Sequence, residues 1–397
     1  MQVRRRHVLF IPGYDPRPPR RYRELYRAEA AAQAAVSGHR IAIAARRGLP
    51  NLAWDVDACI EGARVHATVE ILAWNDLIRD RLRRPIPWIY AMMLVTLWRF
   101  LASGALVAMA RLRPGPLIAG LAPVGFLLAY LAVAAVAGWA AARGAALGGL
   151  PPVAGWGAGL AAFAATMAAT RLLEPWTFAY YLVTDFAHVA EGMGVPPPDL
   201  AARLSQFADR LRAVAAEGDV DEVLLVGHSS GAHLAVSVMA GALARGVAQG
   251  PALSLLTLGQ AIPMASFLPR ARALRRDLGR LACCRRIVWV DVSAPGDGAC
   301  FALCDPVAVS GVAPPGQLWP LVVSAAFSRT LSPRRLRALR WRHFRRHLQY
   351  LCAFDRPGRY DWFAITAGPR TLGDRFAGAG HSPSRVTVPV SPHRSIA

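Results

Sequence analysis

The sequence predicts an α/β protein with a mostly parallel sheet flanked by helices and an apolar helical segment inserted into the chain. Short apolar runs alternate with amphipathic helical stretches in both outer parts of the chain, which is typical of a parallel sheet with two covered faces. A strongly apolar stretch at 86–171 interrupts this alternation, and the hydrophobic fraction of 54% is high for a soluble protein. Because the alternation resumes at 172, we expect both flanking parts to contribute to one sheet.

The expected strands lie on both sides of the apolar stretch. Residues 7–11 (HVLFI) form a short apolar strand that ends at Pro-Gly, and a helix at 20–36 follows it. The further expected elements are strands at 40–45, 66–73, 220–226, 253–258 and 287–292, and helices at 199–216, 230–244 and 333–346. The chain is then divided into 1–85 and 172–377 as the two parts of one domain, 86–171 as the insertion, and 378–397 as a Ser-, Pro- and Arg-rich tail expected to be disordered.

Two segments of the insertion are long and apolar enough to cross a bilayer. Residues 117–142 contain no charged side chain, and residues 152–170 are also uncharged. If the two flanking parts share one sheet, they lie on the same side of the membrane, so the number of crossings must be even. Residues 88–112 contain Arg99 and are expected at the interface or against the protein. Pairing 88–112 with 117–142 would satisfy the same rule.

The placement of arginine predicts which side of the membrane holds the α/β part. Arg171 follows the two spans, and Arg143 is the one basic residue between them. The arginines that precede the spans are Arg79, Arg81, Arg83, Arg84, Arg111 and Arg113. The positive-inside rule therefore predicts an inner or plasma membrane protein with its α/β part in the cytoplasm. The chain begins with only five apolar residues before Pro12, which is too short for a signal-peptide core.

Net charge and cysteine content exclude several classes of function. The formal charge is +21, but all 46 basic residues are arginine, a bias typical of GC-rich coding. No nucleic-acid recognition motif is present, so we expect attraction to anionic lipid head groups and no nucleic-acid partner. The six cysteines form no CxxC pair, so we expect reduced thiols and neither a metal nor another cofactor.

A five-residue motif provides the candidate nucleophile. Residues 227–231 (GHSSG) place Ser229 in a G-x-S-x-G pattern between an expected strand and an expected helix. A serine nucleophile needs this arrangement, because its hydroxyl must project from a tight strand-to-helix turn. Gly227 and Gly231 carry no side chain that would collide there, and His228 completes the elbow. The N-terminus of the following helix favours the negative charge that develops in the reaction.

This strand–GHSSG–helix unit resembles the nucleophile elbow of the α/β-hydrolase superfamily, which includes serine esterases and lipases. The stretch at 10–16 (FIPGYDP) is similar to the loop that supplies the second oxyanion-hole amide in that superfamily. The resemblance implies that backbone N–H groups of Ser230 and of Gly13 or Tyr14 hold the oxyanion. It also implies a catalytic triad in the chain order serine, acid, histidine.

Two aspartates and two histidines are candidates for the remaining triad positions. Asp297 lies in a glycine-rich loop after the expected strand at 287–292, where the superfamily places its acid, and Asp305 is the alternative. His347 opens an apolar stretch that would fix its imidazole, and His343 lies one helical turn earlier. We favour Asp297 and His347, and the alternatives stay open.

The resemblance implies a serine hydrolase that cleaves a carboxylic ester or thioester through an acyl-serine intermediate. The apolar segments favour a lipophilic or membrane-derived substrate, with the lipid bilayer as the partner. An acyltransferase that uses the same triad and a non-catalytic membrane scaffold are the alternatives. A transport role is disfavoured, because the uncharged spans offer no polar site within the membrane.

Overall fold

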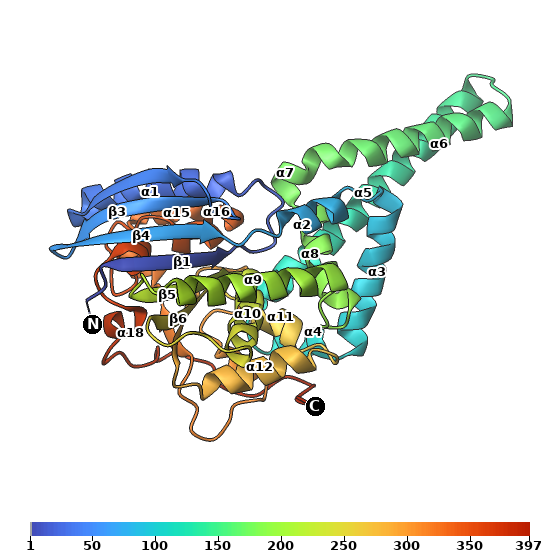
Figure 1. Ribbon diagram of the computed structural model, residues 1–397. Helices are drawn as coiled ribbons and strands as arrows, with labels where there is room; N and C mark the ends of the chain where they lie inside the picture. The colour runs from blue at the N-terminus through green and yellow to red at the C-terminus, as the bar shows by residue number, and fades with distance from the viewer. Residues whose placement is uncertain (1) are drawn as a thin grey trace.

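The computed structural model describes residues 2–397 and has one eight-stranded sheet with helices on both faces (Figure 1). The strand order is β2-β3-β4-β1-β5-β6-β7-β8. The strands are β1 (Arg5–Ile11), β2 (Arg40–Arg46), β3 (Ala53–Ile60), β4 (Ala63–Ile71), β5 (Glu222–His228), β6 (Ala252–Leu258), β7 (Ile287–Ser293) and β8 (Leu321–Ser324). The predicted α/β class is confirmed. The sheet is mixed, because β2, β3 and β4 pair antiparallel while β4 and the remaining strands pair parallel.

The helices form three groups around this sheet. One face packs against α1 (Arg20–Ser37), α14 (Phe327–Thr330), α15 (Pro333–Leu339), the 3-10 helix η2 (Leu348–Leu351), α17 (Trp362–Ala367) and α18 (Leu372–Arg375). The other face packs against α9 (Pro198–Glu217), α10 (Gly231–Ala244), α11 (Ile262–Ser266), α12 (Arg272–Ala282) and α13 (Pro306–Val309). The inserted part comprises α2 (Asn75–Leu82), α3 (Ile86–Ala102), α4 (Ala105–Ala110), α5 (Pro114–Leu147), α6 (Pro152–Ala169), the 3-10 helix η1 (Thr170–Leu173), α7 (Glu174–Thr177) and α8 (Ala179–Glu191).

The strand β1 lies in the middle of the sheet and is buried on both faces. Val8 and Phe10 belong to the core under α1, whereas Leu9 and Ile11 belong to the core under α9 and α10. Successive side chains of a strand point to opposite faces, so a strand covered on both sides must be apolar throughout. This explains why the short run at 7–11 was recognisable as a strand.

The sequence does not predict β3 or β8. In β3 the buried Trp54 and Val56 alternate with Asp55 and Asp57, because this part of the sheet is antiparallel and one face is partly open to solvent. A tight turn with positive φ at Glu61 and Gly62 joins β3 to β4. The strand β8 has only four residues, too few to show a period.

The helices α5 and α6 lie side by side and project from the α/β part as an arm (Figure 1). Two helical stretches, Pro114–Leu147 and Pro152–Thr177, are long and apolar enough to cross a membrane, with mean hydropathies of 2.2 and 1.3 over 18 residues of each. They contain the spans expected at 117–142 and 152–170. The two helices approach closely at Gly138 and Gly159, where a Cβ atom would come within 3 Å of the other glycine's carbonyl oxygen.

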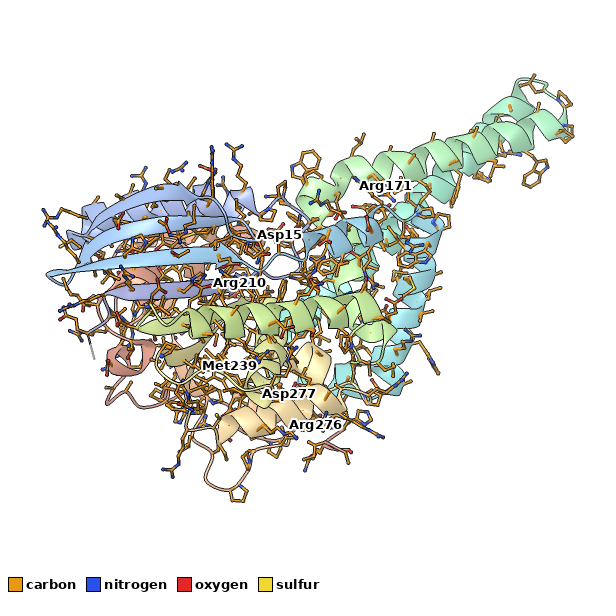
Figure 2. The ribbon with its side chains drawn as sticks, in the orientation of Figure 1. Asp15, Arg171, Arg210, Met239, Arg276 and Asp277 are labelled. Atoms are coloured by element: carbon orange, nitrogen blue, oxygen red, sulfur yellow. The ribbon has the colours of Figure 1, made fainter. Side chains whose placement is uncertain are left out.

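A polar contact joins the base of this arm to the segment between α2 and α3. Arg171, labelled in Figure 2, lies where the arm begins, and its guanidinium donates a hydrogen bond to the carbonyl oxygen of Arg84 at 2.8 Å. The segment 88–112, considered above as an alternative span, is two helices, α3 and α4, separated at Gly104. The helices α2 and α3 would count as a third span only if taken together across a bend of 108°.

The segment after residue 378, expected to be disordered, makes backbone hydrogen bonds to the rest of the chain. It forms no helix, but its backbone runs along the loops around α13. Val386 donates to the carbonyl oxygen of Leu303 at 2.8 Å, Asp305 donates to that of Val386 at 2.9 Å, and Ser382 donates to that of Val322. Backbone pairing of this kind does not depend on side-chain periodicity, so the sequence pattern could not reveal it.

Candidate active site

Ser229 lies at the junction of β5 and α10, in the middle of the sheet. Its φ is +58°, a left-handed conformation that is uncommon for a residue other than glycine. Its amide donates to the carbonyl oxygen of Leu258 at 2.9 Å, and its carbonyl oxygen accepts from the amide of Ala261. The Ser229 side chain is only partly buried. The backbone is therefore fixed on both sides of this serine in the strained turn that the motif predicts.

Both glycines of the GHSSG motif occupy positions that only glycine fits. A Cβ atom on Gly227 would lie 2.5 Å from the carbonyl oxygen of Gly231, and a Cβ on Gly231 would lie 2.4 Å from that of Ile11. The second contact brings the first turn of α10 against the end of β1. These close approaches hold the turn at Ser229 against the loop that follows β1.

The loop after β1 contacts the serine directly. A Cβ atom on Gly13 would lie 2.8 Å from the Cβ and 3.4 Å from the Oγ of Ser229. The neighbouring Tyr14 is buried, its ring packs against Trp74 and His188, and its carbonyl oxygen accepts a hydrogen bond from the hydroxyl of Tyr181. The structure thus places Gly13 beside Ser229, in the loop where the resemblance expects oxyanion donors.

His347 and Asp297 form a buried hydrogen bond. The Nδ1 atom of His347, in α16 (His343–His347), lies 2.7 Å from Oδ2 of Asp297, in the loop after β7. A carboxylate accepts, so Nδ1 carries the proton and donates. Burial opposes ionisation of Asp297, but the charge of His347 and its hydrogen bond hold the Asp297 pKa below the ordinary value. The Nε2 atom of His347 is buried and has no hydrogen-bond partner among residues 2–397.

Further hydrogen bonds fix the carboxylate of Asp297. The amide of Ala299 donates to Oδ1, and the hydroxyl of Tyr350 donates to Oδ2, each at 3.0 Å. The same Tyr350 hydroxyl accepts from the amide of Ala294. The carboxylate therefore has donors on both oxygens, and it can rotate only by breaking them.

Two contacts bring His347 close to the turn at Ser229, one through Gly259 of the neighbouring loop and one through His228, which precedes Ser229. A Cβ atom on Gly259, between Leu258 and Ala261, would lie 3.2 Å from Cε1 of His347 and 3.3 Å from Oδ2 of Asp297. On the other side, the ring of His228 lies 4.6 Å from the ring of His347, and its Nε2 donates to the carbonyl oxygen of His347 at 2.9 Å. Burial lowers the pKa of His228 to about 3, so this ring is neutral near pH 7.

The two alternative residues lie in other surroundings. Asp305 caps the N-terminus of α13, where its carboxylate accepts from the amides of Val307 and Ala308 and pairs with Arg385. His343, at the start of α16, is exposed to solvent. The structure therefore brings Ser229, Asp297 and His347 to one end of the sheet and leaves Asp305 and His343 in other roles.

Asp185 is a neighbour of the site that the sequence did not indicate. This residue of α8 is buried, and the Oγ of Ser230 donates to its carboxylate at 3.2 Å. Burial raises the Asp185 pKa to about 7, against the lowering effects of Ser230 and of the charge of His347. The sequence signal for Asp185 is an acidic residue within the apolar run of α8.

Comparison of this chain with protein-family models, with curated proteins and with solved structures finds no match. Within the described part of the chain, no group of three or more His, Cys, Asp or Glu side chains is placed to hold a metal ion.

The arrangement includes a serine at a strained turn and an imidazole oriented by a carboxylate, which are groups that nucleophilic catalysis by serine uses. A proton on Nδ1 of His347, held by Asp297, leaves Nε2 with a lone pair that can accept another proton. Ser229 is held in a partly buried turn at the start of α10, and Gly13 lies against it. A base oriented by a carboxylate beside a serine at a strand-to-helix turn can support acyl transfer.

Proposed function

We propose that this protein is a membrane-attached serine hydrolase of the α/β-hydrolase type, with Ser229, His347 and Asp297 as its triad. The observation that carries the proposal is the buried hydrogen bond between His347 and Asp297, placed against the elbow of Ser229 through Gly259.

The proposed reaction is acyl transfer in two steps. The Oγ of Ser229 attacks the carbonyl carbon of an ester or thioester while Nε2 of His347 takes the serine proton. The N–H groups of Ser230 and of Gly13 or Tyr14 stabilise the oxyanion, and the leaving alcohol or thiol departs with the proton from His347. Water then attacks the acyl-serine while His347 takes its proton. The bond between the acyl carbon and Oγ breaks, the acid departs, and His347 returns the proton to Ser229.

The location of the site favours a lipophilic or membrane-derived substrate. The helix α8 follows the second apolar stretch after one residue, and its Asp185 contacts Ser230. The site therefore lies close to the base of the arm. With the arm in a bilayer and the α/β part on the cytoplasmic side, a substrate with an acyl chain would reach Ser229 over a short path.

Hydrolysis of a series of p-nitrophenyl esters by the full chain in lipid nanodiscs tests this function. We expect turnover that falls at least ~10³-fold in Ser229→Ala, and kcat/KM that rises with acyl chain length. Unchanged turnover in Ser229→Ala would remove the proposal. Formation of acyl-serine without release to water, but with release to an added alcohol, would assign an acyltransferase instead.

A further inference from the structure

The helix α3 has an apolar stripe that no other part of the described chain covers. Leu94, Trp98 and Leu101 are 61%, 69% and 47% exposed. Their spacing of four and three residues places them on one face of the helix. Val107 of α4, also exposed, continues the stripe. An exposed apolar face of this length is a feature of contact surfaces and membrane-bound helices.

The opposite face of α3 is packed against the protein, which fixes the direction of the stripe. Ile89 and Met93 are buried in a small core with Leu127 of α5 and Val183 of α8. Phe100, two turns further along the same face, contacts the ring of Phe186 edge-on. The helix is therefore anchored by one face, and the exposed stripe with Trp98 lies on the opposite face.

Arg99, the charge that interrupts this apolar segment, does not lie on the stripe. Its guanidinium donates to the carbonyl oxygens of Ala190 and Glu191 at 3.2 and 2.9 Å. These carbonyls belong to the C-terminal turn of α8, where a cation is stabilised by the free carbonyl groups and the helix dipole. The stripe is therefore uncharged.

The direction of α3 relative to the arm suits a helix that lies in the plane of a membrane. In Figure 1, α3 runs across the direction in which α5 and α6 project, on the side of the molecule nearest the arm. Exposed arginines flank the stripe, with Arg83 and Arg84 before α3 and Arg111 after α4. Arg84 also lies 5.4 Å from the ring of Trp88.

We infer that α3 and α4 form an interfacial membrane element, with Leu94, Trp98, Leu101 and Val107 in the acyl-chain boundary of the leaflet that the arm enters. The occupant of the stripe is lipid because the stripe is continuous with the base of an apolar arm and has cations at both ends to meet anionic head groups. A second copy of the chain would bury the stripe as well, but would leave these arginines facing one another.

This inference does not depend on the proposed catalytic function, since lipid contact can be measured without turnover. The full chain is reconstituted in nanodiscs of phosphatidylcholine and phosphatidylglycerol, with or without bromine on acyl carbons near the head group. Emission from single tryptophans is obtained by subtracting the spectra of Trp98→Phe, Trp156→Phe and Trp319→Phe from that of the unaltered protein. Trp98 is exposed, so phenylalanine is tolerated there.

We expect brominated lipid to remove at least about half of the Trp98 emission, as for Trp156 in α6, and to leave the emission of Trp319 unchanged. Trp319 is the control because it is partly exposed and packs near the end of α12, away from the arm. Unquenched Trp98 beside quenched Trp156 would overturn the inference, and a dimer in that case would assign the stripe to a second copy. Unquenched Trp156 would overturn it too, because the arm would then lie outside the bilayer.

Discussion

The Oγ of Ser230 lies 3.2 Å from a carboxylate oxygen of Asp185. This contact joins the residue after the proposed nucleophile to α8, the helix that continues from the arm. A buried carboxylic acid next to the site makes both folding stability and the site itself sensitive to pH.

Asp185→Asn should stabilise the protein at pH 8 relative to the unaltered chain. Burial raises the Asp185 pKa from 3.8 to about 7, so between these values the folded state holds a proton that the unfolded state has lost. The free energy of unfolding therefore falls as pH rises through this window, by as much as about 4 kcal/mol. Asparagine does not ionise, so the variant does not lose this free energy. The difference in free energy of unfolding between the variant and the unaltered protein should therefore widen from pH 4 to pH 8.

Thermal unfolding of both proteins in detergent measures this gap. Burial also raises the pKa of Asp277 and Asp291, but these residues act equally in both proteins and cancel in the difference. Asp209→Asn, at an exposed carboxylate, is the matched control and should leave the difference flat. A gap that stays constant with pH would contradict the buried, protonated state of Asp185.

Asp297→Ala and Asp305→Ala should separate catalysis from stability. Loss of Asp297 leaves His347 without its orienting carboxylate, so we expect ester hydrolysis to fall about 10³- to 10⁴-fold. Loss of Asp305 removes a helix cap and the partner of Arg385, so we expect about 1–2 kcal/mol lower stability with turnover within about threefold. Equal loss of turnover in both variants would show that the acid has been misassigned.

Gly13→Ala should lower turnover without unfolding the protein. The added methyl would lie 2.8 Å from the Cβ of Ser229, so either the loop or the serine must move. A displacement of this size at the reacting atoms costs about 100-fold in kcat. Gly380→Ala is the control, because open space surrounds that position. Full activity in Gly13→Ala would mean that this loop does not face the reacting atoms.

Ser229→Gly should be more stable than Ser229→Ala. Both variants lack the hydroxyl, but only alanine keeps a side chain at a φ of +58°. The left-handed conformation costs a residue with a Cβ about 1–2 kcal/mol, and glycine also gains freedom when unfolded, which reduces the advantage. Chemical denaturation of the two variants measures the difference. Equal stability would indicate that the turn at Ser229 is not strained.

The sequence was most informative where burial or close packing restricts the residue type. The strands β1 and β5 are recognisable because a strand covered on both faces must be apolar throughout. The glycines of GHSSG are recognisable because the turn has no space for a Cβ atom. Asp297 is favoured over Asp305 in the sequence because it directly follows an expected strand. The role of Asp305 as a helix cap depends on α13, which no sequence pattern predicts.

Contacts between distant segments were out of reach of the sequence. Asp185 meets Ser230 only because the chain folds back after the arm and brings α8 to the start of α10, and no local pattern encodes that approach. The last twenty residues make backbone hydrogen bonds to loops near α13. Their side chains are polar and without periodicity, so no sequence pattern predicts these contacts.

The central claim is that Ser229 is an activated nucleophile, and fluorophosphonate labelling tests it most directly. The full chain in nanodiscs is treated with the probe beside Ser229→Ala and His347→Ala, and the modified residue is identified by mass spectrometry. We predict one adduct, on Ser229, with none in Ser229→Ala and a rate at least about 10³-fold lower in His347→Ala. A folded, unaltered protein that stays unlabelled while a known serine hydrolase in the same sample reacts would contradict the account.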